Sequence, residues 1–131
     1  MADKPPIRAD AAECHIVSYA DFVRMPEGTI FSTWEPNIVG EPMVKGETWF
    51  DEDGSPLDFI ESTLGARLYL EDKGGVDHRN PRIAVDRIAG RNGLFEREAE
   101  FIVYPPAAIR LMIARLKEAL AASASGETEG A

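Results

Sequence analysis

Apolar and polar residues alternate in several short segments of this 131-residue chain, and proline or glycine bounds most of them. A period of two with β-branched and aromatic residues is typical of half-buried strands. We therefore expect strands at residues 29–35, 43–50, 57–60, 66–71 and 101–104. Residues 82–89 are compatible with either a strand or a helical turn.

The segment 43–50 gives the clearest alternation of faces. Its even positions, Val44, Gly46, Thr48 and Phe50, suit the core face. Lys45, Glu47 and Trp49 would then point outward, because successive side chains of a strand lie on opposite faces. The run Asp51-Glu52-Asp53-Gly54-Ser55-Pro56 predicts a tight turn after this strand.

A period close to 3.6 appears twice. Ser18 and Asp21 have the spacing of a capping box, which predicts a short helix over 19–25. Pro105-Pro106 predicts the start of a second helix that runs to about Ala121. One stripe of that helix is apolar and should be buried: Ile109, Met112, Ile113, Leu116 and Leu120. Leu111 lies nearly opposite this stripe and, if exposed, is a candidate contact to a second copy or a partner.

These elements predict an α+β protein. The expected architecture is a small antiparallel sheet, or an SH3-like partly closed barrel, with the short N-terminal helix and a C-terminal helix packed on it. Residues 1–13 are expected to be a flexible arm and residues 14–121 a single α+β domain. Residues 122–131 have the composition of a disordered tail.

The charge distribution narrows the choice of partners. The formal net charge is −9, and residues 1–72 hold 15 acidic against 5 basic residues, a net charge of −10. Such a surface repels nucleic-acid phosphates, so we expect no direct nucleic-acid binding. It favours a basic protein partner through electrostatic steering, although charge of this kind can also serve solubility alone.

Tryptophans and carboxylates occur together in the strand pair formed by 29–35 and 43–50. Aromatic residues supply contact area and a rim of charge selects the partner, so this pattern favours a recognition surface. The candidate binding residues are Trp34, Glu35, Glu41, Lys45, Glu47, Trp49 and Asp51. The alternative is that one tryptophan lies in the core and that the carboxylates are merely solvated.

No complete catalytic motif is present in the sequence. A small hydrolase that uses the carboxylates, such as Glu35 and Glu47, or His78 as acid and base is an alternative hypothesis. Cys14 is interpreted as a partly buried small hydrophobe. Two histidines and one cysteine without paired spacing argue against a metal site, and we expect no cofactor.

The runs Pro26 to Pro36 and Lys45-Gly46-Glu47-Thr48, with the stretch from Arg91 into the final helix, resemble small uncharacterised phage and prophage accessory proteins. The resemblance implies a compact accessory protein from a virus or mobile element and carries no catalytic residue. Without an apolar run of about 20 residues we expect no membrane span. The single cysteine, Cys14, excludes an intrachain disulfide, so we expect a reducing, cytoplasmic setting, which the resemblance implies is a bacterial host cell. We therefore expect a non-enzymatic, protein-binding accessory protein, monomeric or a small homo-oligomer. A virion or structural subunit that assembles through Leu111 is the alternative.

Overall fold

The computed structural model describes residues 4–68, 81–93 and 98–127 of the chain. Two compact units share these residues. One unit is Ile16–Val103, and the other combines Met1–His15 with Tyr104–Ala131. The expected packing of the C-terminal helix on the sheet stays a prediction.

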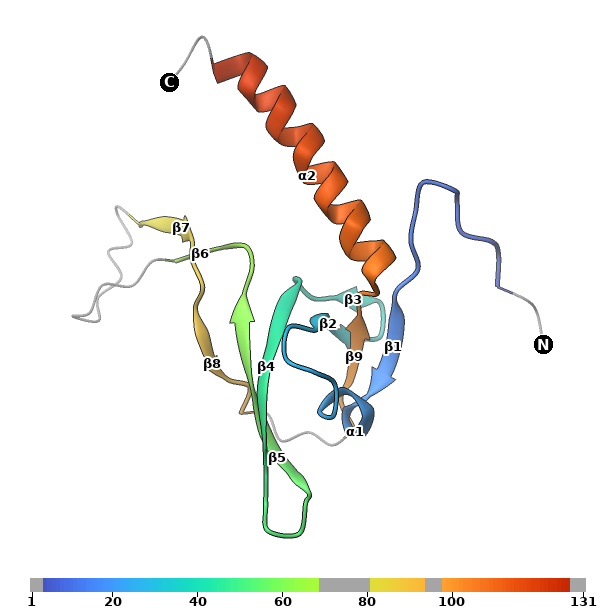
Figure 1. The fold of residues 1–131 in the computed structure, drawn as a ribbon, viewed down its shortest axis with the longest axis vertical. Coiled ribbons are helices and arrows are strands. Elements are labelled where there is room, and N and C mark those ends of the chain that lie inside the picture. Colours follow the sequence, from blue (N-terminus) through green and yellow to red (C-terminus); the bar gives the residue numbers. More distant parts are fainter. Residues whose placement is uncertain (1–3, 69–80, 94–97, 128–131) are drawn as a thin grey trace. The chain divides into compact units, whose positions relative to one another are not determined.

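The first unit is built around one sheet in which β9 pairs with strands far away in sequence, β1 and β2, whereas β4 pairs with the nearby β2 and β5 (Figure 1). Among the described residues its strands are β1 (His15–Ser18), β2 (Ile30–Glu35), β3 (Ile38–Val39), β4 (Met43–Phe50), β5 (Pro56–Thr63), β8 (Ala89–Arg91) and β9 (Glu100–Val103). Their order is β1-β9-β2-β4-β5-β8, and β3 pairs with β2. β6 (Ala66–Leu68) and β7 (Ile83–Val85) form a separate two-stranded ribbon. The predicted α+β class is confirmed, with a mostly antiparallel sheet that does not close into a barrel.

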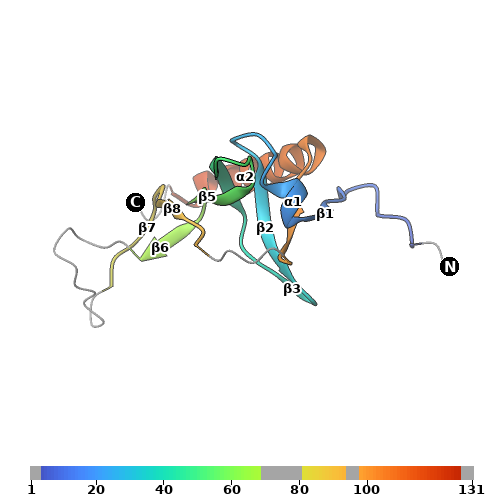
Figure 2. The ribbon, with the colours of Figure 1, turned by 90° about the horizontal axis from the view of Figure 1, so that it is seen from below.

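The core of this unit is a cluster of phenylalanines around a one-turn helix, α1 (Tyr19–Phe22). As the capping box predicts, the Ser18 hydroxyl accepts a hydrogen bond from the Asp21 backbone N–H at 3.2 Å. Figures 1 and 2 show α1 beside the sheet, and the Phe22 ring lies 4.2 Å from that of Phe101 and 4.7 Å from that of Phe31, between centroids. The short helix thus places a fully buried ring against the middle of the sheet.

The alternation expected for 43–50 is interrupted in β4. The β4–β5 register shifts between Lys45 and Thr48, as at a β-bulge, and again between Trp49 and Phe50. Met43 stands opposite the buried Phe31 and therefore lies on the core face. Lys45 lies two residues further along β4, so it belongs to the same face. The predicted outward position of Lys45 is therefore wrong, since it is only 2% exposed, and the predicted core position of Phe50 is wrong, since it is 46% exposed.

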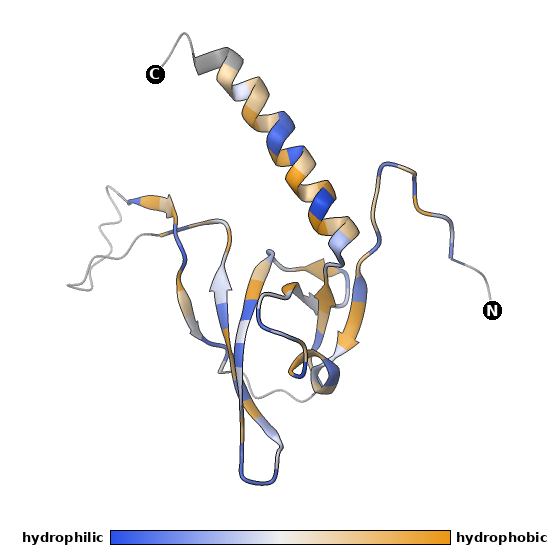
Figure 3. Ribbon diagram, viewed as in Figure 1, coloured by the Kyte–Doolittle hydropathy of each residue, from blue (hydrophilic) through white to orange (hydrophobic). Residues whose placement is uncertain are grey.

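The second unit contains one long helix, α2 (Pro106–Glu127), which continues past the predicted end at Ala121. Figure 3 shows hydrophobic residues recurring along it between charged ones. Within the described residues of this unit the apolar stripe has no cover over Ile113, Leu116 and Leu120, which are 45, 67 and 68% exposed. Leu111, expected to be exposed, is half-buried. No helix in the described part of the chain is long and apolar enough to cross a membrane.

Candidate functional site

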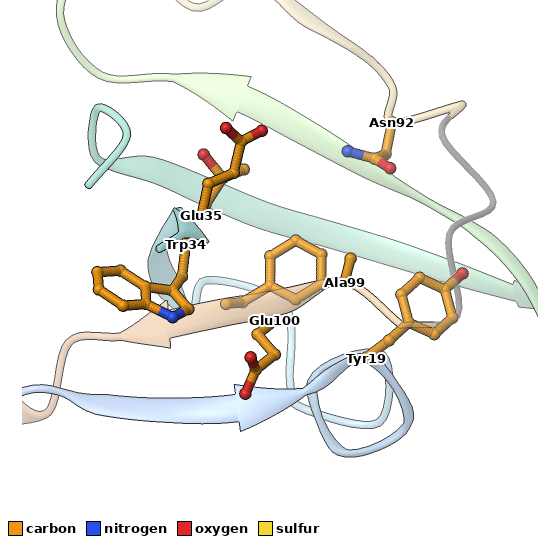
Figure 4. A pocket seen from close by; sticks show the side chains of 8 residues that line it. Tyr19, Trp34, Glu35, Asn92, Ala99 and Glu100 are labelled. Carbon is orange, nitrogen blue, oxygen red and sulfur yellow. The ribbon is translucent and has the colours of Figure 1, made fainter. Parts of the chain in front are cut away.

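A pocket opens at the end of the β2–β9 pair, with a volume of about 260 Å³. We call it the Trp34 pocket; its lining residues are Tyr19, Thr33, Trp34, Glu35, Asn92, Ala99, Glu100 and Phe101. In Figure 4 the side chains of Glu35 and Glu100 point to opposite sides of the strands, with Trp34 near the same end. Of the two carboxylates, Glu100 therefore shares the sheet face of Trp34, and Glu35 lies on the other face.

Trp34 and Glu100 are direct neighbours in this pocket. They are Cα partners in the antiparallel β2–β9 register. Residues so placed have Cβ atoms about 4.5–5.5 Å apart and share one face of the sheet. Trp34 is half-buried and Glu100 is exposed, so an indole face and a carboxylate are offered side by side to solvent.

The second tryptophan repeats this arrangement across the β4–β5 pair. Trp49 and Asp58 are Cα partners in the β4–β5 register. Here a cation is already in place: the Arg91 guanidinium carbon lies 5.5 Å from the Trp49 ring centroid, and Arg91 Nε is 3.1 Å from Asp58 Oδ2. These residues and Leu57 line a shallow hollow of about 310 Å³, which we call the Trp49 site. The same protein thus shows how a tryptophan and an opposed carboxylate hold an arginine.

Asp58 is the anchor of the Trp49 site. Its side chain is almost fully buried, and burial by itself raises the pKa of a carboxyl. The backbone N–H groups of Phe59 and Gly93 donate to it at 2.8 and 3.1 Å, and Arg91 adds a charge-assisted bond. Together these donors outweigh the desolvation and hold the pKa of Asp58 below its ordinary value.

Asn92 connects the Trp49 site to the Trp34 pocket. It follows Arg91 directly and lines the pocket, and its backbone N–H donates to the Phe59 carbonyl at 2.9 Å. Its side-chain amide donates to Glu61 Oε2 at 3.3 Å. Burial raises the pKa of Glu61, and the Asn92 bond partly opposes that shift. The turn after β8 therefore brings a third carboxylate close to the pocket residue Asn92.

Lys45 belongs to a different hollow, of about 490 Å³, between the segment 23–27 that follows α1 and strand β4. Its Nζ donates to the Thr48 hydroxyl at 2.7 Å and to the Gly46 carbonyl at 3.0 Å. Burial lowers the pKa of Lys45, and the nearby Glu27 carboxylate opposes this shift. The Lys45 ammonium group is therefore bonded within the fold and is not available to a partner. Glu47 lines the same hollow.

The predicted binding residues consequently do not form one surface. Glu41 is ion-paired with Arg67 at 2.7 Å, and the Asp51 carboxylate accepts the backbone N–H groups of Asp53 and Ser55, both at 2.9 Å, in the β4–β5 turn. Trp34 and Glu35 share the Trp34 pocket, whereas Trp49 lies in its own site.

The residues named for acid–base chemistry are not brought together in the described residues. Glu35 and Glu47 line separate hollows, and His78 lies outside the described residues. Burial raises the pKa of the half-buried Cys14 thiol, which disfavours the reactive thiolate. In the described part of the chain no three His, Cys, Asp or Glu side chains are grouped so as to hold a metal ion.

Sequence reasoning missed the residues that complete both tryptophan sites, namely Glu100, Asp58 and Arg91. The available signal was that both tryptophans stand in alternating segments, but the strand register that pairs each with its carboxylate is a long-range property. Chemically, the Trp34 pocket offers a π surface and negative charge, a combination that suits a cationic side chain. Comparison with protein-family models, with curated proteins and with solved structures finds no match to this chain.

Proposed function

We propose that this protein is a non-enzymatic protein-binding protein whose Trp34 pocket receives an arginine side chain from a basic partner. The observation that supports it is the repeated tryptophan–carboxylate pair. The Trp49–Asp58 pair holds Arg91, whereas within residues 4–68, 81–93 and 98–127 no arginine occupies the Trp34–Glu100 pair. An arginine supplied by another protein would complete the second pair in the same way.

The charge of the sheet unit supports a basic partner. Residues 16–103 hold 17 acidic against 9 basic residues, a net charge of −8. A field of this sign raises the association rate of positively charged proteins and repels nucleic acid. Proteins with clustered arginines are typical nucleic-acid binders, so the biological role we propose is to occupy such a surface in a bacterial host. The expected origin in a phage or prophage stays a prediction.

Arginine suits the pocket better than lysine does. A planar guanidinium can stack on an indole and donate to a carboxylate at the same time, as Arg91 does beside Trp49 and Asp58. An ammonium group is a compact, strongly hydrated charge and lacks the stacking surface. The pocket therefore predicts a preference for arginine over lysine at equal peptide charge.

Isothermal titration calorimetry of the full chain with an arginine–serine repeat peptide tests the proposal. Trp34→Ala and Glu100→Gln should each weaken binding about 2- to 5-fold, since exposed cation–π and ion-pair contacts each contribute about 0.5–1 kcal/mol. A peptide with lysine in place of arginine should bind more weakly than the arginine peptide. Affinity should fall as salt increases, because exposed charges are screened.

The matched control is Glu52→Gln, which removes the same charge from an exposed position of the β4–β5 turn. It should leave the affinity almost unchanged. If Glu52→Gln weakens binding as much as Glu100→Gln, overall charge and not the pocket is responsible. Absence of binding by the unmodified chain, or salt-independent binding that requires α2, would also contradict the proposal.

A further inference from the structure

Helix α2 carries an apolar seam that is exposed within its own unit and that the proposed arginine pocket does not use. Ile109, Ile113, Leu116 and Leu120 follow one another at intervals of four, three and four residues. This spacing is that of heptad positions d, a, d and a, in which one helix packs its knobs into the holes of another. Ile113, Leu116 and Leu120 are exposed and Ile109 is half-buried.

We propose that this seam is a self-association surface and that its occupant is α2 of a second copy, parallel and in register. The central heptad has isoleucine at a (Ile113) and leucine at d (Leu116). A β-branched residue at a with leucine at d favours two parallel strands over higher assemblies. The seam residues themselves therefore specify a dimer.

The charges beside the seam favour the parallel arrangement. Arg110 and Lys117 occupy e positions, and Met112 and Ala119 occupy g positions. In a parallel pair each e residue faces a g residue of the other helix, so Lys117 meets Met112, on which its aliphatic stem can pack. In an antiparallel pair e residues face each other, which would set Arg110 against Lys117. Like charges in contact disfavour that arrangement.

The seam is short, so the dimer should dissociate readily. From Ile109 to Leu120 it covers about three helical turns, or roughly 17 Å. A standard stable interface buries about 800 Å² on each partner, which three turns of one helix stripe supply only in part. The expected behaviour is a monomer–dimer equilibrium that depends on protein concentration.

Sedimentation velocity of the full chain over about a hundredfold range of concentration tests self-association. The mean mass should rise toward that of a dimer. Leu116→Glu should weaken the dimer at least about tenfold, because it places a charge at the centre of the seam. Ala114→Glu introduces the same side chain at an exposed position off the seam and should leave the equilibrium unchanged. Circular dichroism checks that both variants keep their helix.

Cross-linking tests the direction of the helices. In a Cys14→Ser background, Ser123→Cys places a thiol at the next d position, where parallel in-register helices bring it next to its own copy. Oxidised glutathione as oxidant should then give a disulfide-linked dimer. Ala122→Cys, one residue off the seam, should cross-link far less.

Each other result overturns the proposal. A mass that stays monomeric at every concentration would show that something else covers the seam, such as this chain's own sheet or an unrelated partner. A dimer that survives Leu116→Glu would place the contact elsewhere. A dimer lost in Leu116→Glu but cross-linked equally by both cysteines, or by neither, would refute the parallel register.

Discussion

Asp58 shows how a single buried charge organises the turn that leads to the Trp34 pocket. Its carboxylate accepts from two backbone N–H groups and from Arg91, and only 2% of its side chain is exposed. Because the fully buried charge has all of these donors, its ionised form is favoured. The position of Asn92, between Arg91 and Gly93, follows from the same anchoring. Asp58 thus helps to position Asn92, which lines the Trp34 pocket.

Replacing this carboxylate should weaken the fold in a pH-dependent way. Asp58→Asn is expected to lower the free energy of unfolding at pH 7 by about 1–3 kcal/mol, because Arg91 and Gly93 lose a charged acceptor. The folded state lowers the pKa of Asp58, so its contribution is complete above the unfolded-state value of about 3.9. It is lost as the pH falls through the lower, folded-state pKa.

Urea denaturation at pH 7 and in acid measures both effects. The gap between the native chain and Asp58→Asn should shrink in acid. Asp53→Asn, in the exposed β4–β5 turn, is the control and should change stability by less than about 0.5 kcal/mol. If the difference in stability between the native chain and Asp58→Asn increases in acid, the inferred lowering of the Asp58 pKa is contradicted.

At the scale of the element, the irregular register of β4 decides which side chains reach the core. Gly46 lies at the first shift, where a Cβ would meet the Ile60 Cβ and Cγ2 atoms at 3.0 Å. The close approach of β4 and β5 at this point therefore depends on the missing side chain. The same irregularity accompanies the inward turn of Lys45, which the regular alternation of the sequence did not predict.

Gly46→Ala should therefore destabilise the protein by about 1–3 kcal/mol, since the added methyl group overpacks a close strand pair. Gly65→Ala is the matched control, because a Cβ there would meet nothing within 4 Å and its backbone is not in the left-handed region. Thermal unfolding should show a clear decrease in Tm for Gly46→Ala and little change for Gly65→Ala. Equal effects in the two variants would contradict the role assigned to this contact.

Local patterns predicted most elements but not the contacts between them. The cap at Ser18, the strand 43–50 and the proline start of α2 depend on neighbours within a few residues, and the structure has all three. The orientation of Lys45 depends on the register with β2 and β5, which no local pattern contains. Likewise, Trp34 and its surrounding carboxylates could be named as candidates, but the opposition of Trp34 and Glu100 requires pairing between distant strands.

At the scale of the whole molecule, the uneven charge should affect stability as well as binding. Carboxylates exceed basic groups by eight in residues 16–103, so the folded sheet unit concentrates negative charge. Self-repulsion of this kind destabilises the compact state and is screened by salt. We expect the urea midpoint of the full chain to rise when NaCl is increased from low to physiological concentration.

The control for this effect is Glu52→Lys, which reduces the excess of negative charge at an exposed turn without touching the core. Its midpoint should depend less on salt than that of the native chain. A midpoint that falls with added NaCl would show that attractive ion pairs, such as Arg67–Glu41, outweigh the repulsion.

The position of β9 between β1 and β2 has a consequence for the order of folding. Thr33 pairs with Phe101 across most of the sheet unit's sequence, and β1 has β9 as its neighbour in the sheet. During synthesis, a chain that has reached Arg91 has made β2, β4, β5 and β8 but still lacks the strand that joins β1 to them. The entropy cost of closing so long a loop must be met before the contacts between β9 and its neighbours can stabilise the chain. Topologies of this kind therefore fold slowly. The aromatic core, which needs Phe101, can be completed only after synthesis has passed all the other strands of the sheet and reached β9.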